Sequence, residues 1–427
     1  MSETHIIDDK EILKEKVDSL FDFILFPIYK DNRVHPCRQE ISALYILDTH
    51  CWYRFIIPIN HSEKAGDITI FDIENIMRDK NIYVWDKKSF IHHTNKLNGL
   101  YDLQLITYYK GFTYSEPHLF QQYYHKWERF SNINTIIPLP RLFDEVNKWV
   151  EQNDICETFY QYRESTLEKS YPQYEKVIET FADIEKSGIY HKDNGLQYTQ
   201  YNLFTTTGRP SNRFGGINYA ALNKSDDTRT HYTSRYEGGK LFLYDYEAFH
   251  PTMISNYLKI ERPEGISPHY WLGQQYFGKD ELTDEELEES KKLTFYYLYG
   301  DMTEVKDIEF FSKVNEFIDT FEGKDHMITP ILKRTIPTEG MNKTKMFNYF
   351  LQNLESEINF MKLRELNQYL REYKSKMVLY TYDSFLIDYS PHDPKSVLTD
   401  IKSILEKNQL KVSVKYGNDY KNMKDIS

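Results

Sequence analysis

Two aspartates, Asp245 and Asp383, each follow an apolar, aromatic-rich stretch that is typical of a β-strand. Magnesium prefers oxygen ligands, commonly one or two carboxylates together with substrate phosphates. Two such ions can clamp the attacking and leaving oxygens of an in-line phosphoryl transfer. If the two strand ends are adjacent, this pair predicts a nucleotidyl-transfer site with two Mg²⁺ ions, for which Mn²⁺ can substitute. Each stretch alone is more typical of a buried strand that ends in a turn.

A predicted helix over residues 282–299 carries a second group of residues that can do chemistry. Thr283 is a suitable N-cap, and acidic residues fill the first turn. Lys291, Phe295 and Tyr299 recur every four residues and therefore share one face. Such a face can hold a triphosphate at one end and a base and sugar at the other. A core stripe with one lysine that reaches solvent is the alternative interpretation.

Two further segments have side chains suited to nucleic acid. The turn at residues 205–212 contains hydroxyl groups and Arg209, which can contact phosphates or groove edges. A predicted helix over residues 347–369 places Asn348 and Gln352 on one face, where amides can read acceptor edges in a minor groove. A surface turn and an ordinary polar helix face are the alternatives.

Composition limits the class of protein. The chain has 427 residues, 51.3 kDa, 40% hydrophobic and 28% charged residues, which is enough for two or three globular domains. The net charge of −12 does not exclude nucleic acid, because a basic cleft can lie on an acidic body. Apolar stretches fall short of the roughly 20 residues of a membrane span. With no signal-like N-terminus, we expect a cytoplasmic protein without a membrane partner.

The three cysteines, Cys37, Cys51 and Cys156, match neither a zinc site nor a disulfide framework, so we expect them to be packing residues. The elements fall into three parts. Residues 1–140 alternate strand-like runs with helices, which favours an α/β domain. The next stretch, to Ser187, is helical, and the remainder mixes both types. The strand-like runs of the first part are 23–29, 41–47, 53–59 and 82–85.

In this order the segments resemble the family A DNA polymerases. Five motifs carry the resemblance, each short but all in the family's order. They are Thr207-Gly208-Arg209-Pro210-Ser211 with Asn218; Asp245-Tyr246; Lys291, Phe295, Tyr299 and Gly300; Asn348 and Gln352; and Tyr382-Asp383-Ser384. The resemblance implies a right-hand polymerase with an antiparallel-sheet palm, helical fingers and a reduced helical thumb, preceded by a ribonuclease H-like exonuclease-type α/β domain.

The resemblance also implies a role for each matched residue. Asp245 and Asp383 would be the two metal carboxylates, and Lys291 would neutralise charge as pyrophosphate leaves. The nucleotide pocket would be formed by Tyr246, His250, Lys291, Lys292, Phe295 and Tyr299. The primer-template would be contacted by Thr207, Arg209, Asn218, Asn348, Gln352 and Tyr382.

The chain departs from the family pattern at three positions. His250 replaces the glutamate that restricts the sugar, and it can exclude a 2′-hydroxyl by bulk while hydrogen-bonded to Tyr299. Leu287 replaces an arginine one turn before Lys291, so Lys292 is expected to help bind the γ-phosphate. Ser384 replaces an acid that is secondary to metal binding. The motif at Asp245 also resembles its family B version, in which Lys292 would be the key lysine.

The N-terminal part resembles the family's 3′–5′ exonuclease domain less specifically. Phe26 to Tyr29 stand where its first strand would carry two acids, so we expect a degenerate, non-nuclease domain, with Asp48 and Asp102 as reserve candidates. The implied division has five parts. They are 1–140, exonuclease-like; 141–200, reduced thumb; 201–255, first part of the palm; 256–330, fingers; and 331–427, second part of the palm.

The resemblance implies a template-directed DNA polymerase without proofreading, whose partners are primer-template DNA, dNTPs and a helicase or processivity factor. A compact phage, plasmid or viral enzyme would fit the short thumb, in which case the compartment is the host cytoplasm. An RNA polymerase or primase-like enzyme on the same palm is the alternative that His250 favours. A non-catalytic polymerase-derived binding module is the third interpretation, although it would predict loss of Asp245 or Asp383.

Overall fold

The computed structural model describes residues 5–426, apart from internal gaps. The residues left out are 32–33, 51–52, 65, 95–96, 112–136, 153–154, 165–168, 213–221 and 223–224. The chain forms two compact units and passes between them several times. Unit 1 is Met1–Ser187, Tyr198–Thr206 and Ser211–Asn218, and unit 2 is Gly188–Gln197, Thr207–Pro210 and Tyr219–Ser427.

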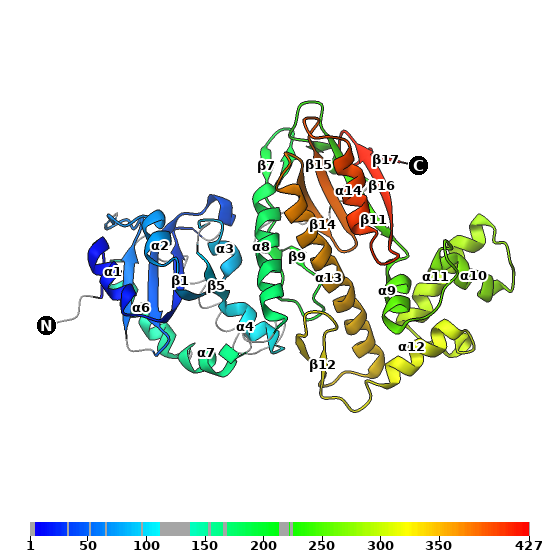
Figure 1. Ribbon diagram of the computed structural model, residues 1–427, viewed down its shortest axis with the longest axis horizontal. Coiled ribbons are helices and arrows are strands. Elements are labelled where there is room, and N and C mark those ends of the chain that lie inside the picture. The colour runs from blue at the N-terminus through cyan, green and yellow to red at the C-terminus, as the bar shows by residue number, and fades with distance from the viewer. Residues whose placement is uncertain are drawn as a thin grey trace. The chain divides into compact units, whose positions relative to one another are not determined.

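A mixed five-stranded sheet is the centre of unit 1 (Figure 1), with strand order β3-β2-β1-β4-β5. The pairs β1–β2 and β2–β3 are antiparallel, whereas β1–β4 and β4–β5 are parallel. Every residue of β1 and β2 is buried, as expected of strands covered on both faces. The strands are β1 (Asp22–Tyr29), β2 (Ile41–Asp48), β3 (Arg54–Pro58), β4 (Asn81–Val84) and β5 (Gly99–Asp102).

Helices cover both faces of this sheet. Leu13 and Ile73, on α1 and α2, join the core formed by alternate strand residues such as Phe23. The opposite face carries Phe26, whose ring meets Trp149 of α6 edge-on at 5.5 Å. The first helix of the stretch expected to be a thumb therefore covers the sheet of unit 1. The helices are α1 (Lys10–Asp18), α2 (Ile70–Ile76), α3 (Lys87–Phe90), α4 (Leu103–Tyr109), α6 (Leu139–Gln152), α7 (Ile155–Arg163) and α8 (Tyr171–Ser187).

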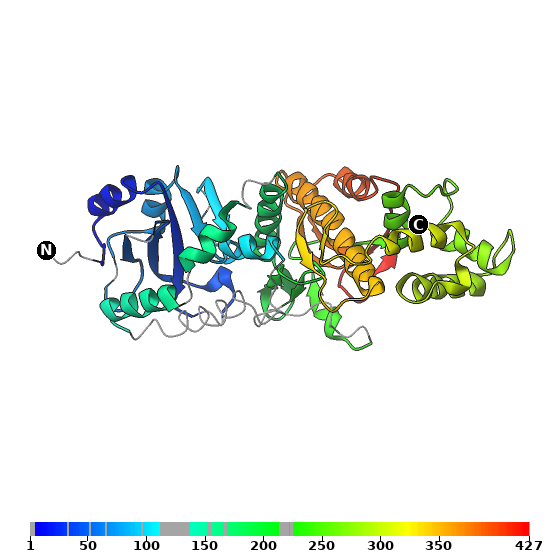
Figure 2. The same cartoon turned by 90° about the horizontal axis from the view of Figure 1, so that it is seen from below.

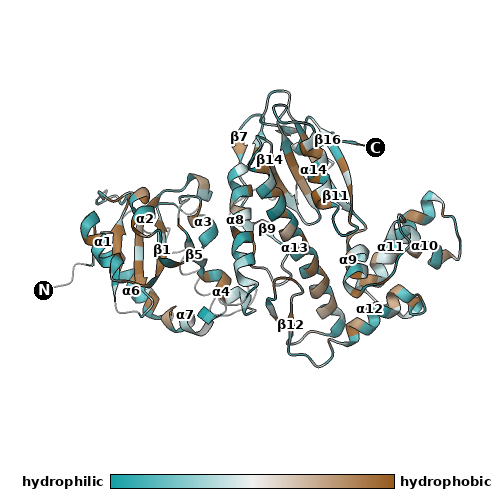
Figure 3. Cartoon of the chain, in the orientation of Figure 1, coloured by the Kyte–Doolittle hydropathy of each residue, from teal (hydrophilic) through white to brown (hydrophobic). Residues whose placement is uncertain are grey.

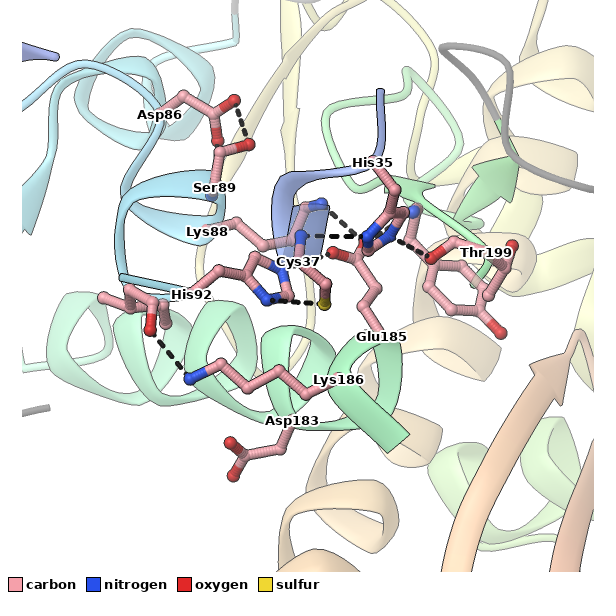
Figure 4. A network of polar contacts seen from close by, with 12 residues as sticks. His35, Cys37, Asp86, Lys88, Ser89, His92, Asp183, Glu185, Lys186 and Thr199 are labelled. Carbon is pink, nitrogen blue, oxygen red and sulfur yellow. Dashed lines mark hydrogen bonds and ion pairs between the residues drawn. The ribbon is translucent and has the colours of Figure 1, made fainter. Parts of the chain in front are cut away.

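A buried polar network joins α8 to α3 within unit 1 (Figure 4). Glu185 is fully buried; its Oε1 accepts from Lys88 Nζ and Tyr201 N, each at 2.6 Å, and its Oε2 lies 3.1 Å from His92 Nε2. The other ring nitrogen of His92 lies 3.3 Å from Cys37 Sγ. Burial would raise the pKa of Glu185, but Lys88 and His92 lower it to about 2. Both carboxylate oxygens are therefore fully engaged.

An antiparallel five-stranded sheet organises unit 2, with strand order β14-β15-β11-β16-β17. Apolar residues concentrate on the strands of both sheets (Figure 3). One face of the unit 2 sheet is covered by the long helix α13 and by α14 (Figure 1). These elements are β11 (Lys240–Glu247), β14 (Lys376–Thr381), β15 (Ser384–Tyr389), β16 (Lys411–Gly417), β17 (Lys424–Asp425), α13 (Lys343–Leu370) and α14 (Ser396–Leu405).

A group of helices completes unit 2. Helices α10 and α11 lie side by side in both views (Figures 1 and 2), and α9 packs on α13. The helices are α9 (Phe249–Leu258), α10 (Pro268–Phe277), α11 (Asp284–Tyr299) and α12 (Glu309–Asp319). Unit 2 also has a three-stranded sheet, β6 (Ile189–His191) between β7 (Gly195–Gln197) and β10 (Tyr232–Thr233), and the pair β12 (His326–Ile328) with β13 (Thr335–Pro337). The pair β8 (Tyr201–Asn202) with β9 (Ser211–Asn212) belongs to unit 1.

Most predicted elements are confirmed. The four strand-like runs are β1 to β4, and the helix predicted from residue 282 begins at Asp284, capped by Thr283 in a capping box. One expectation was wrong: Cys156 is disulfide-bonded, although Cys37 is free. Sequence spacing cannot reveal cysteines that only the fold brings together. Within the described part of the chain, no helix has both the length and the apolarity needed to cross a bilayer.

Candidate functional site

The sheet of unit 2 brings Asp245 and Asp383 together. Asp245 on β11 pairs with Ser384, the first residue of β15, and with Ser413 on β16. The backbone N–H of Tyr246 donates to the carbonyl of Asp383 at 3.2 Å. The turn between β14 and β15 therefore lies beside Asp245, at the same end of the sheet.

The electrostatics of Asp383 indicate a concentration of negative charge. Burial raises the pKa of its carboxyl group, and the nearby Glu355 carboxylate raises it further, against the opposite effect of His250 and Arg209. A divalent cation would remove this repulsion, and carboxylates are the ligands that Mg²⁺ prefers. Asp245 and Asp383 are thus suited to hold the predicted metal ions.

Beside the aspartates, four polar side chains from four segments form one network. Glu355 of α13 is 1% exposed, and its Oε2 accepts from Arg209 Nη2 at 2.5 Å and from His250 Nε2. The hydroxyl of Tyr299, at the end of α11, bonds His250 Nδ1. Burial would raise the pKa of Glu355, but His250 and Arg209 lower it below its usual value, so the group is a carboxylate at neutral pH.

Glu355 was missed by the sequence reasoning. It lies seven residues after Asn348 and three after Gln352, so all three share one face of α13. This spacing was the signal that could have found it, but an acidic residue on a charged helix is normally solvated. The hydrogen bond between His250 and Tyr299, suggested by the sequence, is present.

The stripe predicted on α11 borders this network. Phe295 and Tyr299 stack with their ring centroids 6.3 Å apart, and Phe295 lies 6.3 Å from the His250 ring. Phe295 is 40% exposed, so its ring is available to a ligand. Lys291 pairs with Glu288 and Lys292 with Glu289, and both lysines are solvent-accessible. The aromatic end of the stripe thus faces His250, and the cationic end reaches solvent.

The Thr207-Gly208-Arg209 turn lies against α13. Gly208 has φ +72°, and a Cβ there would lie 2.5 Å from the Asn353 side-chain oxygen. Only glycine permits this close approach. It places the guanidinium of Arg209 next to Glu355 and 5.6 Å from the centre of the Tyr382 ring. Thr207, half-buried, stands in the same turn.

The remaining predicted residues divide into two groups. Asn348 and Gln352 are half-buried on α13, and Asn348 Oδ1 has no hydrogen-bond partner among the described residues. The side chain of Tyr246 is not at the site, although its backbone N–H bonds Asp383: the ring alternates with the Asp245 side chain on β11, the residue is 6% exposed, and its hydroxyl donates to Leu405 O at 3.2 Å. Asn218 lies outside the described residues.

A separate cluster of potential metal ligands lies elsewhere in unit 2. His191, Asp193 and His231 offer ligand atoms within 4.8 Å of one another. Asp193 Oδ2 is 2.8 Å from His231 Nδ1, an ion pair that accounts for its depressed pKa. Because Asp193 is exposed and its pairing is explained by His231, we assign no ion there.

Sequence comparison found no matching family model and no matching curated protein. By structure, the chain has the fold of a DNA polymerase domain. A solved structure that shares this fold is the POL domain of Pol1 from M. smegmatis in complex with DNA primer-template and dNTP, with a TM-score of 0.74 and 12% identity over 96% of this chain and 98% of that one. At this identity the likeness establishes the fold.

Proposed function

We propose that this protein is a template-directed DNA polymerase of the family A type, which adds dNTPs to a primer 3′-end. The observation that carries the proposal is the adjacency of Asp245 and Asp383 on a sheet with the polymerase fold. Bound Mg²⁺ would activate the 3′-hydroxyl and stabilise the leaving pyrophosphate. Asp245 and Asp383 would hold these ions, and the Glu355 carboxylate would add to the negative potential around them.

The other residues of the site have roles that follow from their positions. Lys291, at the solvent end of the α11 stripe, and the adjacent Lys292 would bind the triphosphate, while Phe295 and Tyr299 would contact the base and sugar. Primer-template DNA would be contacted by Thr207, Arg209, Asn348, Gln352 and Tyr382, with Asn218 assigned by resemblance alone. The thumb, palm and fingers boundaries given above, and a helicase or processivity partner, belong to the same proposal.

We also propose that unit 1 is a ribonuclease H-like domain without nuclease activity. Its mixed sheet flanked by helices supports the fold. The reserve acids already have structural partners: Asp48 accepts from Tyr53 N at 3.0 Å, and Asp102, fully buried, caps α4 and accepts from Lys87 N at 2.8 Å. Burial raises the pKa of Asp102, which disfavours a metal-binding carboxylate.

The test is extension of a labelled primer-template with Mg²⁺, with dNTPs and rNTPs supplied separately. We expect dNTP addition by the wild type and losses on the order of 10³-fold for Asp245→Ala and Asp383→Ala, because each removes a metal ligand. Glu247→Ala, an exposed carboxylate two residues further along β11, is the matched control and should extend normally. A wild type that extends nothing, or variants that extend like Glu247→Ala, would contradict the proposal.

One observation favours a second candidate function, RNA synthesis. His250 stands where the family's sugar-restricting glutamate is expected. Equal use of rNTPs and dNTPs in the same assay would replace the DNA polymerase proposal by this one.

A further inference from the structure

We infer that Asn359 of α13 is a positioning residue for Asp383, because it holds the strained turn that presents this carboxylate. The inference rests on the proposed function and adds a residue to which the resemblance assigns no role. Asn359 is fully buried, and its Nδ2 donates to the carbonyl of Tyr382 at 2.8 Å. Since Tyr382 directly precedes Asp383, this contact acts on the backbone next to the proposed metal ligand.

The turn that carries Asp383 has only two residues. Thr381 on β14 pairs with Ser384 on β15, so Tyr382 and Asp383 form the whole connection. Tyr382 has φ +55°, a left-handed conformation that two-residue turns favour but that normally requires glycine or asparagine. A tyrosine in this conformation is strained, so the turn depends on contacts from other elements to keep its shape.

Both peptide groups beside Asp383 are anchored by such contacts. The carbonyl before it, that of Tyr382, accepts from Asn359, and its own carbonyl accepts from Tyr246 N at 3.2 Å. The first anchor is a side chain of α13, and the second is the backbone of β11, the strand that carries Asp245. With the two flanking peptide groups fixed, the backbone of Asp383 has one conformation, and its carboxylate has a defined origin.

The surroundings of Asn359 show that its amide is committed to this contact. A carbonyl oxygen can only accept, so the NH₂ group of Asn359 faces Tyr382. The same Nδ2 donates to the hydroxyl of Tyr380, buried on β14, at 3.2 Å. Asn359 Oδ1 is enclosed without a partner among the described residues, which costs stability. A leucine of similar size would avoid that cost, so packing alone does not account for an asparagine here.

Support of this kind matters for a metal site. Residues that orient a ligand without touching the ion typically contribute about 10- to 100-fold in metal affinity. Asn359 stands in this relation to Asp383, because it bonds the neighbouring peptide group and not the carboxylate. Its loss should therefore weaken metal binding more than it weakens the fold.

The experiment measures metal binding without turnover, with Mn²⁺ as the probe. Mn²⁺ is titrated into the protein bound to a saturating dideoxy-terminated primer-template and the next dNTP, and free Mn²⁺ is followed by electron paramagnetic resonance. Binding that Asp383→Ala abolishes is counted as binding at the site. We expect Asn359→Leu to weaken it by about 10-fold or more. Adding Tyr382→Gly should recover part of this loss, about 3-fold or more, because glycine adopts the positive φ without strain.

A matched control separates positioning from general damage. Lys362 lies three residues after Asn359 on α13, is 5% exposed and donates to Ile404 O at 2.8 Å. Lys362→Met removes a contact of the same kind, to α14 and not to the turn, and should leave Mn²⁺ affinity unchanged. Urea denaturation compares the stability of the two variants. If Asn359→Leu fails to fold, Asn359→Ala removes the same amide without added bulk and takes its place.

Two outcomes would overturn the inference alone. One is site binding in Asn359→Leu that equals the wild type or is weakened no more than in Lys362→Met, which would make Asn359 a structural residue only. The other is a loss that Tyr382→Gly does not reduce, so that the strained turn is not what Asn359 holds. In both cases the wild type would still extend primers, and the proposed function would stand. A wild type with neither Asp383-dependent Mn²⁺ binding nor extension would remove the proposed function and this inference together.

Discussion

Each unit contains a buried glutamate that contacts one nitrogen of a histidine ring whose other nitrogen contacts a thiol or hydroxyl, but the surroundings of the two arrangements differ. In unit 1, Glu185 faces His92 Nε2, and His92 Nδ1 faces the Cys37 thiol. In unit 2, Glu355 faces His250 Nε2, and His250 Nδ1 faces the Tyr299 hydroxyl. Each glutamate is buried on a long helix, and each also accepts from a cation, Lys88 or Arg209.

The difference lies in what remains unsatisfied. Both oxygens of Glu185 have partners, and burial raises the pKa of Cys37 to about 11, so this thiol is protonated and inert at neutral pH. Glu355 leaves Oε1 without a partner among the described residues and raises the pKa of Asp383. The Glu185 network, whose carboxylate is fully paired, holds helices together. The Glu355 network lies beside the Asp245–Asp383 pair and leaves one carboxylate oxygen unpaired among the described residues.

The largest expected effect comes from a substitution that breaks the buried polar network around Glu185 in unit 1. Glu185→Ala should lower the free energy of unfolding by about 3–5 kcal/mol, because it leaves Lys88 buried without its counter-ion. Urea denaturation followed by circular dichroism measures this loss. Glu179→Ala, on the same helix but half-exposed and paired with Lys87, should cost about 1 kcal/mol or less. Equal losses of unfolding free energy in the two variants would show that Glu185 makes no special contribution to stability.

The next effect concerns pH. Because the folded-state pKa of Glu185 is about 2, below its ordinary 4.5, its stabilisation is complete above about pH 4.5 and is lost as the pH falls towards 2. We expect a loss of about 3 kcal/mol across this window. The difference in urea midpoint between wild type and Glu185→Gln, measured from pH 7 down to 3, isolates this group. A difference that does not shrink on acidification would contradict the assignment.

A smaller effect tests the turn that places Arg209 in unit 2. Gly208→Ala should cost about 2–4 kcal/mol, since it adds a contact with Asn353 to the strain of φ +72°. The Asn353 oxygen cannot move away freely, because it accepts from the buried Arg334 at 2.9 Å. Gly238→Ala shares the positive φ but has no atom closer than 3.9 Å, so it should cost only about 1–2 kcal/mol. Thermal unfolding of the two variants compares them directly.

The smallest effect on stability is expected for the two lysines of α11, Lys291 and Lys292, which primer extension can then tell apart. Lys291→Ala and Lys292→Ala should each change stability by less than about 1 kcal/mol, because their glutamate partners are exposed. In primer extension, Lys291→Ala should raise the KM for dNTP by about 10-fold or more, as expected for loss of a charged phosphate contact. A larger rise for Lys292→Ala would transfer the main triphosphate contact to that residue.

The sequence predicted the helices and strands that carry the site better than the hydrogen-bond network around Glu355. Periodicity gave the strand before Asp245 and the α11 face with Lys291 and Phe295, because both are local patterns. The choice of Tyr246 for the nucleotide pocket ignored strand alternation, which buries its ring. The spacing of Glu355 from Asn348 and Gln352 placed it on their helix face, but it did not reveal that Glu355 is buried, because its partners Arg209 and His250 are far away in the chain.

The chain crosses between the units at residues 187–188, 197–198, 206–207, 210–211 and 218–219. Tyr201, whose N–H completes the partners of Glu185, belongs to unit 1 but follows a segment of unit 2. During synthesis, unit 1 therefore cannot complete the buried polar network around Glu185 until residues beyond Ser187 have been made. A gene cut at that point would encode an N-terminal fragment with an unfinished core, so separate expression of the units requires a redesigned connection rather than a stop codon.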